Sequence, residues 1–291
     1  MEALITILTQ AMLNIREENR EVLLQKLKSH SYETNGVRLL SREESDVLNF
    51  NDYEGELTGY DCEICKNKGR TAYLSAEGRF TAKECSCMPL RRFSENMNNS
   101  GLKDLLKIYT FDNYMIENEW QKIIKYRALK YVSDIPDEND AMKWFCIFGA
   151  VGSGKTHICT AICDKILHSG GKVAYMLWRE ESVRLKASIN DDEAYREIFK
   201  PFKEADTLYI DNFLKCKQGA RPTDADINLA FELINHRYYM PDSRTIISSE
   251  KSFDEILEFD EAVGSRISQR CGEQYKIQIN PGEGKNMRLA V

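Results

Sequence analysis

The run from Trp144 to His157, WFCIFGAVGSGKTH, constrains the fold of this chain more than any other feature. Its first five residues, 144–148, are all apolar, which is typical of a strand in a parallel sheet that helices cover on both faces. The glycines Gly149, Gly152 and Gly154 then allow a tight turn whose backbone N–H groups face one anion at the start of a helix. A glycine-rich turn without a ligand is the alternative, but strand, loop and helix follow one another in the order that phosphate binding requires.

The same run matches GxxxxGK[ST], the pattern of loops that hold nucleoside triphosphates. In this pattern Lys155 reaches the β- and γ-phosphates and the Thr156 hydroxyl binds Mg²⁺. We therefore expect ATP or ADP, with Mg²⁺, as the cofactor. The residues expected to contact the nucleotide are Gly149, Ala150, Val151, Gly152, Ser153, Gly154, Lys155, Thr156 and His157.

A second strand is expected at residues 206–211, with Asp211 at its carboxyl end. There Asp211 would hold Mg²⁺ opposite Thr156. Most ATPases of this general type carry another carboxylate at the next position, where it polarises the attacking water, whereas this chain has Asn212. An amide can orient water but cannot accept its proton, so slow ATP hydrolysis is expected.

The pattern after residue 156 alternates helices and strands, which predicts a doubly wound α/β fold. We expect a helix at 156–167, a strand at 173–178, helices at 179–189 and 191–202, and a strand at 245–248. A last strand is expected at 275–279. Little sequence follows it, so no C-terminal helical lid is expected.

The strand at 245–248 leads into Ser248, Ser249 and Glu250. These hydroxyls either lie beside the γ-phosphate or cap the next helix, and the sequence leaves both open. Glu250 is a candidate to compensate for Asn212. Further on, Arg266 and Arg270 are four residues apart, so they lie on one helical face. One of them is a candidate arginine finger for a neighbouring subunit, the alternative being a solvated helix face.

Bulk properties limit the remaining possibilities. The 291 residues suffice for two domains, and no apolar run approaches the roughly 18 residues that a membrane span requires. The first ten residues lack the features of a secretory signal, and nine cysteines suit a reducing compartment, so a cytoplasmic protein is expected. The net charge of −6 excludes a whole-surface electrostatic hold on nucleic acid.

The N-terminal part divides into two regions that we interpret separately. Residues 1–60 are read as helical, because apolar residues from Leu4 to Leu27 recur at helical spacing. This stripe serves either an interaction surface or internal packing. Residues 41–61, at the end of that region, are acidic and without clear periodicity, which favours a loop or linker. Residues 61–108 form the second region and 109–291 the nucleotide-binding domain.

Four cysteines are clustered in the second region: Cys62, Cys65, Cys85 and Cys87. A CxxC turn followed by a close second pair supplies four sulfur ligands to one tetrahedral ion, and zinc fits this set best. Residues 72–80 could form the intervening hairpin, with its turn at Glu77 and Gly78. Four sulfur ligands leave no open position for catalysis, so the site is expected to be structural. Four unrelated thiols are the alternative.

The motifs GAVGSGKTH, LYIDNF, TIISSE and GSRISQR, in this order and spacing, resemble the AAA+ core of bacterial and phage replicative helicase loaders of the DnaC/DnaI type. The cysteine-rich module and the YTFDNY run ahead of the core are similar to loaders of the DnaI kind. By motif, Lys155 and Thr156 match the phosphate and Mg²⁺ ligands, Asp211 the metal-positioning acid, Ser249 the sensor and Arg266 the finger. Arg288 is a weaker match for a second sensor, and residues 109–114 match the adenine-side segment.

The resemblance implies an ATP-binding helicase loader. Its N-terminal part would dock on the replicative DNA helicase, and its AAA+ core would assemble as a homo-oligomer on single-stranded DNA. An ATPase of DNA transposition or replication initiation is the first alternative. A small-molecule kinase is the second, and it is disfavoured because neither an acceptor pocket nor a lid is recognisable.

Two groups of basic residues are candidates for DNA contact. Near Trp178 they are Arg179, Arg184 and Lys186, and after Asp211 they are Lys215, Lys217 and Arg221. No interleaved aromatic ladder accompanies them, so solvated faces remain the alternative.

Overall fold

The computed structural model describes residues 40–99, 107–135, 143–217, 220–282 and 285–287. The chain divides into two compact units, residues 1–84 and 85–291. Two expected features lie outside the described residues, namely the apolar stripe from Leu4 to Leu27 and the weaker sensor candidate Arg288. Among the described residues, no helix combines the length and the apolar character that a membrane span requires.

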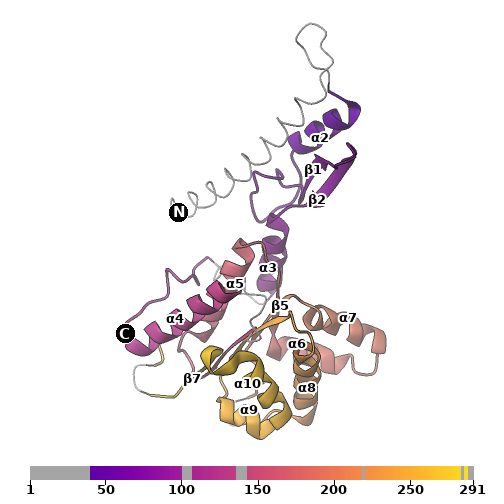
Figure 1. Ribbon diagram of the computed structural model, residues 1–291. Coiled ribbons are helices and arrows are strands. Elements are labelled where there is room, and N and C mark those ends of the chain that lie inside the picture. The colour runs from indigo at the N-terminus through magenta and orange to yellow at the C-terminus, as the bar shows by residue number, and fades with distance from the viewer. Residues whose placement is uncertain (1–39, 100–106, 136–142, 218–219, 283–284, 288–291) are drawn as a thin grey trace. The chain divides into compact units, whose positions relative to one another are not determined.

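The first unit contains helix α2 (Arg42–Asp52) and a hairpin of β1 (Arg70–Leu74) and β2 (Phe80–Glu84) (Figure 1). The strands pair antiparallel, with Ala72 opposite Ala82, so the expected hairpin is confirmed. The Asn51 side chain joins α2 to β1, because its amide donates to the Ala72 carbonyl at 2.8 Å and its oxygen accepts from the Ala72 N–H at 2.9 Å.

The expectation of a loop over 41–61 is wrong at its start, where α2 occupies residues 42–52. Ser41 caps this helix by accepting from the Glu44 N–H at 3.1 Å, while the Glu44 carboxylate accepts from the Ser41 N–H at 2.8 Å. This reciprocal capping box satisfies two backbone donors that would otherwise be unpaired. The helix is mostly solvated and buries no residue fully, so it shows little apolar periodicity.

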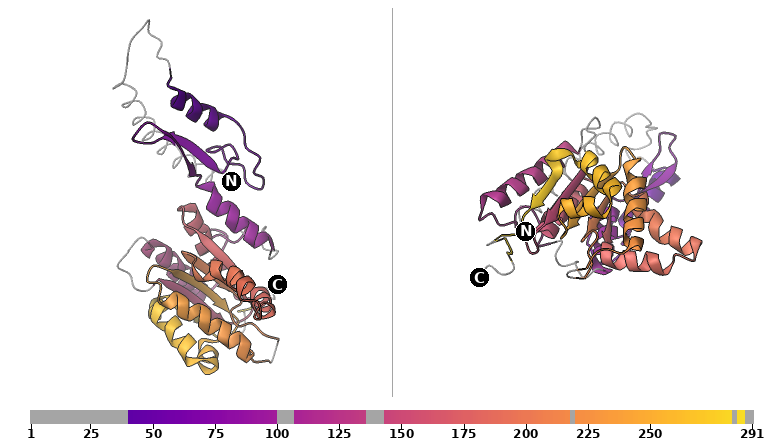
Figure 2. Two further views of the ribbon diagram at one scale, coloured as in Figure 1. Left: turned by 90° about the vertical axis from the view of Figure 1, so that its right-hand side faces the viewer. Right: turned by 90° about the horizontal axis from the view of Figure 1, so that it is seen from below.

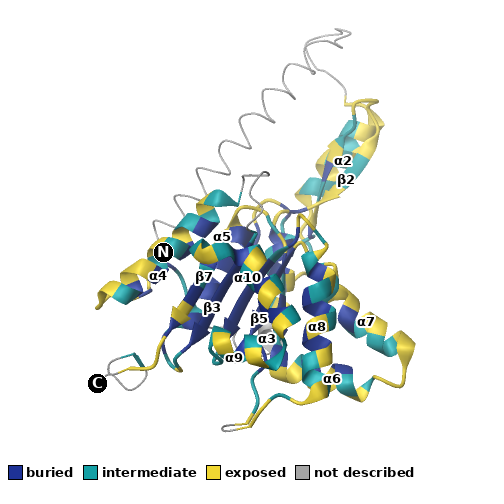
Figure 3. Ribbon diagram, turned by 60° about the horizontal axis from the view of Figure 1, so that its bottom comes forward, coloured by how far each residue is buried: buried dark blue, intermediate teal, exposed yellow. Residues whose placement is uncertain are grey.

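The second unit is built on a five-stranded sheet in the order β4-β5-β6-β3-β7. The strands are β3 (Trp144–Gly149), β4 (Val173–Leu177), β5 (Thr207–Asp211), β6 (Arg244–Ser249) and β7 (Lys276–Ile279). All four neighbouring pairs are parallel. Every residue of β3 and β5 is buried, as the dark strands in Figure 3 show. The expected doubly wound α/β sheet is therefore confirmed, with β3 as an interior strand.

Helices cover both faces of this sheet (Figures 1 and 2). On one side lie α3 (Cys87–Asn99), α4 (Glu119–Asp134) and α5 (Lys155–His168). On the other lie α6 (Trp178–Ala187), α7 (Asp192–Lys203), α8 (Asp224–Tyr238), α9 (Phe253–Phe259) and α10 (Glu261–Tyr275). The division follows from right-handed crossovers: α5 connects β3 to β4 across one face, whereas the later connections run back across the other.

Most predicted elements after residue 144 agree with the structure within two residues, and one boundary shows how packing fixes an end. The strand expected to reach Trp178 stops at Leu177, and Trp178 begins α6. Its indole is 1% exposed and packs edge-on against Phe213, with ring centroids 4.9 Å apart. The tryptophan is thus used as the first buried residue of a helix.

Candidate functional site

Three adjacent strands end at one edge of the sheet in the second unit. Strand β3 ends at Gly149, β5 at Asp211 and β6 at Ser249, and the three are neighbours in the order β5-β6-β3. Because parallel strands place their carboxyl ends together, residues far apart in sequence converge there. The convergence brings the expected phosphate loop next to the expected metal-binding acid.

The phosphate loop passes from β3 into α5 through left-handed backbone at its glycines. Gly149 has φ of +103° and Gly154, the N-cap of α5, has φ of +79°. A β-carbon on Gly149 would lie 2.1 Å from the Ile279 carbonyl oxygen, so only glycine fits beside β7. Ser153 fastens the turn by donating from its hydroxyl to the Ala150 carbonyl at 2.7 Å. The loop is therefore preformed, with the first N–H groups of α5 available to an anion.

Lys155 lies folded back on this loop. Its ammonium donates to the carbonyl oxygens of Gly149 at 2.8 Å and Ala150 at 2.6 Å, and the residue is only 7% exposed. Burial lowers the pKa of Lys155 to about 8, and the nearby carboxylates of Glu250 and Asp211 partly offset this effect. The nearby carboxylates thus offset only part of the cost of burying this cation. A phosphate group bound at the loop would further stabilise the charged ammonium.

Asp211 accepts hydrogen bonds from three hydroxyl groups. The donors are Thr156 at 3.3 Å, Tyr175 at 3.3 Å and Ser248. The carboxylate is 2% exposed, so these bonds satisfy an ion that water barely reaches. Thr156 and Asp211, predicted as a pair, are therefore brought together. Tyr175 was missed by the sequence reasoning, since no motif marks a tyrosine on the neighbouring strand.

Asn212 follows Asp211 with φ of +58°, a region that asparagine enters more readily than most residues. Its N–H donates to the Ser248 hydroxyl at 3.2 Å. Ser249, expected at the sensor position, donates instead to the Phe213 carbonyl at 2.7 Å and accepts from the Lys251 N–H at 3.1 Å. Ser248 is therefore the hydroxyl that reaches the acid. Neither serine caps α9, because Ser252 takes that position.

Glu250, the candidate to compensate for Asn212, forms an ion pair with Lys215 at 2.8 Å. Both side chains are about one-third exposed at the same edge as the phosphate loop. The pair draws Lys215 toward the site, and any role of Glu250 as a base would first require this ion pair to open.

The two candidate finger arginines on α10 have different surroundings. Arg270 donates to the carbonyls of Met240, Pro241 and Ser243, so it fastens the turn between α8 and β6. Arg266 donates to Ala262 at 2.8 Å and stacks its guanidinium over Phe231 and Tyr238 of α8, at 5.3 and 5.6 Å from the ring centroids. Arg266 is thus the less constrained of the two.

The segment around residues 109–114 packs against the start of α5. Tyr109 stacks on His157, with centroids 4.6 Å apart, and Tyr114 meets the same imidazole edge-on at 5.2 Å. His157 Nε2 lies 2.9 Å from the Thr110 carbonyl oxygen, which can only accept, so Nε2 carries the proton. Burial lowers the pKa of His157, so the imidazole is neutral at pH 7.

The four clustered cysteines are brought together as the sequence predicts. The sulfur atoms of Cys62, Cys65, Cys85 and Cys87 all lie within 4.8 Å of one another, and all four residues are buried. The Gly69 N–H points at the Cys65 sulfur at 3.3 Å, and Lys66 and Asn67 have positive φ in the turn between them. Four converging sulfurs with an N–H directed at one of them fit a tetrahedral metal ion with thiolate ligands.

Most of the basic residues considered for DNA contact are paired with carboxylates. Ion pairs join Arg184 to Glu181, Lys186 to Asp226 and Arg221 to Glu258, at 2.9, 2.6 and 3.5 Å. Trp178 is buried, so it presents no ring on which a base could stack.

Sequence and structure comparisons place this site in a known family. The profile of the bacterial DnaA ATPase domain matches residues 105–272, more than half of the chain. The phage-like element PBSX protein XkdC of Bacillus subtilis (strain 168) is 29% identical over 242 residues, which cover 81% of this chain and 89% of that protein. The replicative helicase loader DnaC of Escherichia coli (strain K12) is 29% identical over 143 residues, 49% of this chain and 53% of DnaC.

Among solved structures, the crystal structure of DnaI is similar with a TM-score of 0.50 at 16% identity, covering 61% of this chain and 93% of that chain. At this identity the similarity establishes the fold alone. The sheet order, the phosphate loop and the family match agree with one another. The chain therefore belongs to the bacterial DnaA ATPase-domain family and is an AAA+ protein of the DnaC/DnaI type.

Proposed function

We propose that this chain is an ATP-binding helicase loader of DNA replication, which docks on the replicative DNA helicase and helps to place it on single-stranded DNA. The observation that carries the proposal is the convergence of Lys155, Thr156 and Asp211 at the carboxyl edge of the sheet. This arrangement supplies a cation for phosphate oxygens beside a hydroxyl and a carboxylate for a metal ion.

In this proposal the nucleotide is ATP, which hydrolysis converts to ADP and phosphate before fresh ATP replaces the ADP. The backbone N–H groups of residues 149–157 and the Lys155 ammonium hold the phosphates, while Thr156 and Asp211 hold Mg²⁺. When bound, Mg²⁺ neutralises charge on the phosphate oxygens. Ser248 and Tyr175 orient the Asp211 carboxylate toward Thr156, since each donates to one of its oxygens.

We propose slow hydrolysis, because Asn212 stands where a second carboxylate would accept a proton from water. ATP binding alone can then act as the switch, provided that the nucleotide favours one state of the assembly. Hydrolysis would be completed by Arg266 of a neighbouring copy in a homo-oligomer. The guanidinium of Arg266 rests on two aromatic rings, so it could leave them without breaking a buried ion pair.

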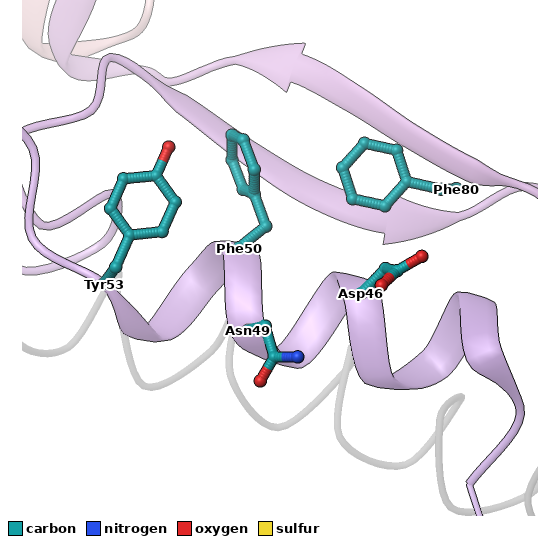
Figure 4. A pocket seen from close by; sticks show the side chains of 5 residues that line it. All are labelled: Asp46, Asn49, Phe50, Tyr53 and Phe80. Carbon is teal, nitrogen blue, oxygen red and sulfur yellow. The ribbon is translucent and has the colours of Figure 1, made fainter.

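The N-terminal part supplies the helicase contact in this proposal. We assign residues 1–60 to a helical region, 61–108 to a zinc-binding module with its linker, and 109–291 to the AAA+ domain. Zinc held by Cys62, Cys65, Cys85 and Cys87 would brace the hairpin. The first unit also has a pocket between α2 and the hairpin, lined by Asp46, Asn49, Phe50, Tyr53 and Phe80 (Figure 4). Tyr53 and Phe80 are 53% and 40% exposed, which is apolar surface suited to a protein partner.

The test is to mix the chain with a replicative helicase, ATP and single-stranded DNA, and to follow helicase binding to the DNA by size exclusion and anisotropy. A joint peak that depends on ATP is expected with the parent chain, and Lys155→Ala should lose it. If Lys155→Ala binds ATP as tightly as the parent and still delivers helicase to DNA, the proposal fails.

A second candidate is an ATPase of replication initiation, which the match to the DnaA ATPase domain favours. Such a protein would assemble on DNA with ATP in the absence of a helicase. ATP-dependent assembly of the chain alone on DNA, with no joint peak with helicase, would support this candidate over the loader.

A further inference from the structure

Tyr114 has a buried hydroxyl group that has no role in the proposed function. The residue is 2% exposed, and its hydroxyl has no hydrogen-bond partner among the described residues. A buried hydroxyl without a partner is unfavourable, because water can no longer satisfy it. The Tyr114 hydroxyl is therefore a candidate hydrogen-bond donor to a bound ligand.

The Tyr114 hydroxyl is aimed at the beginning of α5. A β-carbon placed on Gly154 would lie 3.1 Å from the Tyr114 ring and 3.7 Å from its hydroxyl oxygen. Gly154 is the N-cap of this fourteen-residue helix. The free N–H groups and the positive end of the helix dipole are therefore beside the hydroxyl.

The ring is held in this position from several directions. Tyr114 packs edge-on against His157, which is bonded to the Thr110 carbonyl and stacked under Tyr109. Asn113 fixes the preceding turn, since its N–H donates to the Thr110 hydroxyl at 3.2 Å. The direction of the hydroxyl is thus set before any ligand binds.

Met287 covers the same point. Its methyl carbon would lie 2.9 Å from a β-carbon on Gly154, and its N–H donates to the Gly152 carbonyl at 3.0 Å. Its sulfur accepts from the Gln121 amide at 3.0 Å. The flexible Met287 thioether therefore lies beside the Tyr114 ring against the phosphate loop at Gly154.

We propose that Tyr114 is a further nucleotide-binding residue, whose hydroxyl donates a hydrogen bond to a phosphate oxygen of the bound nucleotide once the Met287 side chain moves aside. The inference rests on the proposed ATP binding and deepens it. A phosphate is the expected acceptor because the neighbouring N–H groups select an anion. Desolvation raises the pKa of Tyr114 to about 12, so the hydroxyl keeps its proton at neutral pH.

The test is Tyr114→Phe in the full chain, with ATP, ADP and adenosine binding measured by calorimetry. We expect ATP affinity to fall about tenfold, the loss of one hydrogen bond to a charged group. Adenosine affinity and the melting temperature without nucleotide should not fall, since the hydroxyl has no partner in the free protein. The matched control is Tyr195→Phe on α7, whose hydroxyl donates to Glu232 at 2.6 Å, and it should leave ATP affinity unchanged.

Met287→Ala supplies an independent arm. Removing the cover should raise ATP affinity in the parent chain but not in a chain that also carries Tyr114→Phe. An equal rise in both backgrounds, or unchanged ATP affinity in Tyr114→Phe while Lys155→Ala abolishes binding, overturns the inference and leaves the proposed function standing. If adenosine affinity falls as much as ATP affinity, the hydroxyl contacts the nucleoside and the phosphate assignment is wrong. If the parent chain binds no nucleotide, both the inference about Tyr114 and the proposed function are wrong.

Discussion

The Thr156 hydroxyl donates to the Asp211 carboxylate at 3.3 Å, although the two residues are 55 positions apart. One stands in the first turn of α5 and the other at the end of β5, with β6 between β5 and the strand that leads into α5. The contact exists because parallel strands end at a common edge, and it places two oxygen ligands of the kind that Mg²⁺ prefers side by side.

Asp211→Asn should remove the effect of Mg²⁺ on ATP binding. The amide is nearly isosteric but has no charge to hold a divalent ion, so ATP affinity with Mg²⁺ should fall about tenfold toward its Mg²⁺-free value. Titrations of a fluorescent ATP analogue, with Mg²⁺ and with excess chelator, measure this difference. A variant that still gains as much affinity from Mg²⁺ as the parent would show that Asp211 is not a metal ligand.

The phosphate loop and its neighbouring strands could be predicted because their signals are local. An unbroken apolar run marks a buried strand, and the glycines at 149 and 154 mark positive φ. Helix α2 was missed because its start depends on the Ser41 and Glu44 cap rather than on an apolar stripe.

Side-chain contacts between distant segments could not be predicted in the same way. The apolar pattern of the sequence shows that Ser248 and Ser249 belong to one strand. Which of the two hydroxyls reaches Asp211 depends on the face of the sheet that each serine occupies. The meeting of Tyr114 and Met287 at Gly154 depends on where two loops cross the sheet edge, and no local pattern encodes it.

Because of Lys155, ATP affinity and the stability of the fold should change in opposite directions as pH rises. Burial lowers its pKa to about 8 in the free protein, whereas the unfolded chain has the ordinary value of 10.5. Between these values the unfolded state binds more protons, so this group makes unfolding less favourable as pH rises from about 8 to 10.5. A bound phosphate favours the charged ammonium, so ATP affinity should fall over the same range.

The measurement is the difference between the parent chain and Lys155→Met, because the variant cancels the titration of other groups. The free energy of unfolding without nucleotide is followed for both chains from pH 7 to 10. ATP affinity is followed over the same range for the parent chain, because Lys155→Met is expected to lose ATP binding. A parent chain whose stability relative to the variant declines across this range would contradict the lowered pKa of Lys155.

Zinc removal should destabilise the cysteine cluster. Structural zinc sites with thiolate ligands contribute on the order of 10 kcal/mol of apparent folding free energy. The Cys62→Ser variant should therefore lose bound zinc. The backbone amides of residues 70–84 should also lose their protection from hydrogen exchange. Cys216 lies outside the cluster, so the Cys216→Ser variant should bind as much zinc as the parent chain. The zinc site is excluded if the parent chain purifies without bound metal and a chelator leaves hydrogen exchange at the hairpin unchanged.

Arg237 tests whether hydrogen bonds or desolvation dominate at a buried cation. Its guanidinium is fully buried and donates to the carbonyls of Phe202, Lys203, Ala205 and Arg244 and to the Thr245 hydroxyl. Burial lowers the pKa of Arg237 to about 10, and the residue remains charged at pH 7.

Arg237→Met replaces the cation with an apolar side chain and leaves several buried carbonyls without a donor. Each such group costs about 1–3 kcal/mol, so we expect a loss of about 3 kcal/mol after the relief of desolvation is subtracted. Urea unfolding measures it. Arg221→Met removes an exposed arginine whose ion pair with Glu258 spans 3.5 Å, and should change stability by less than about 0.5 kcal/mol. If Arg237→Met is instead as stable as the parent, the desolvation of the guanidinium outweighs its hydrogen bonds.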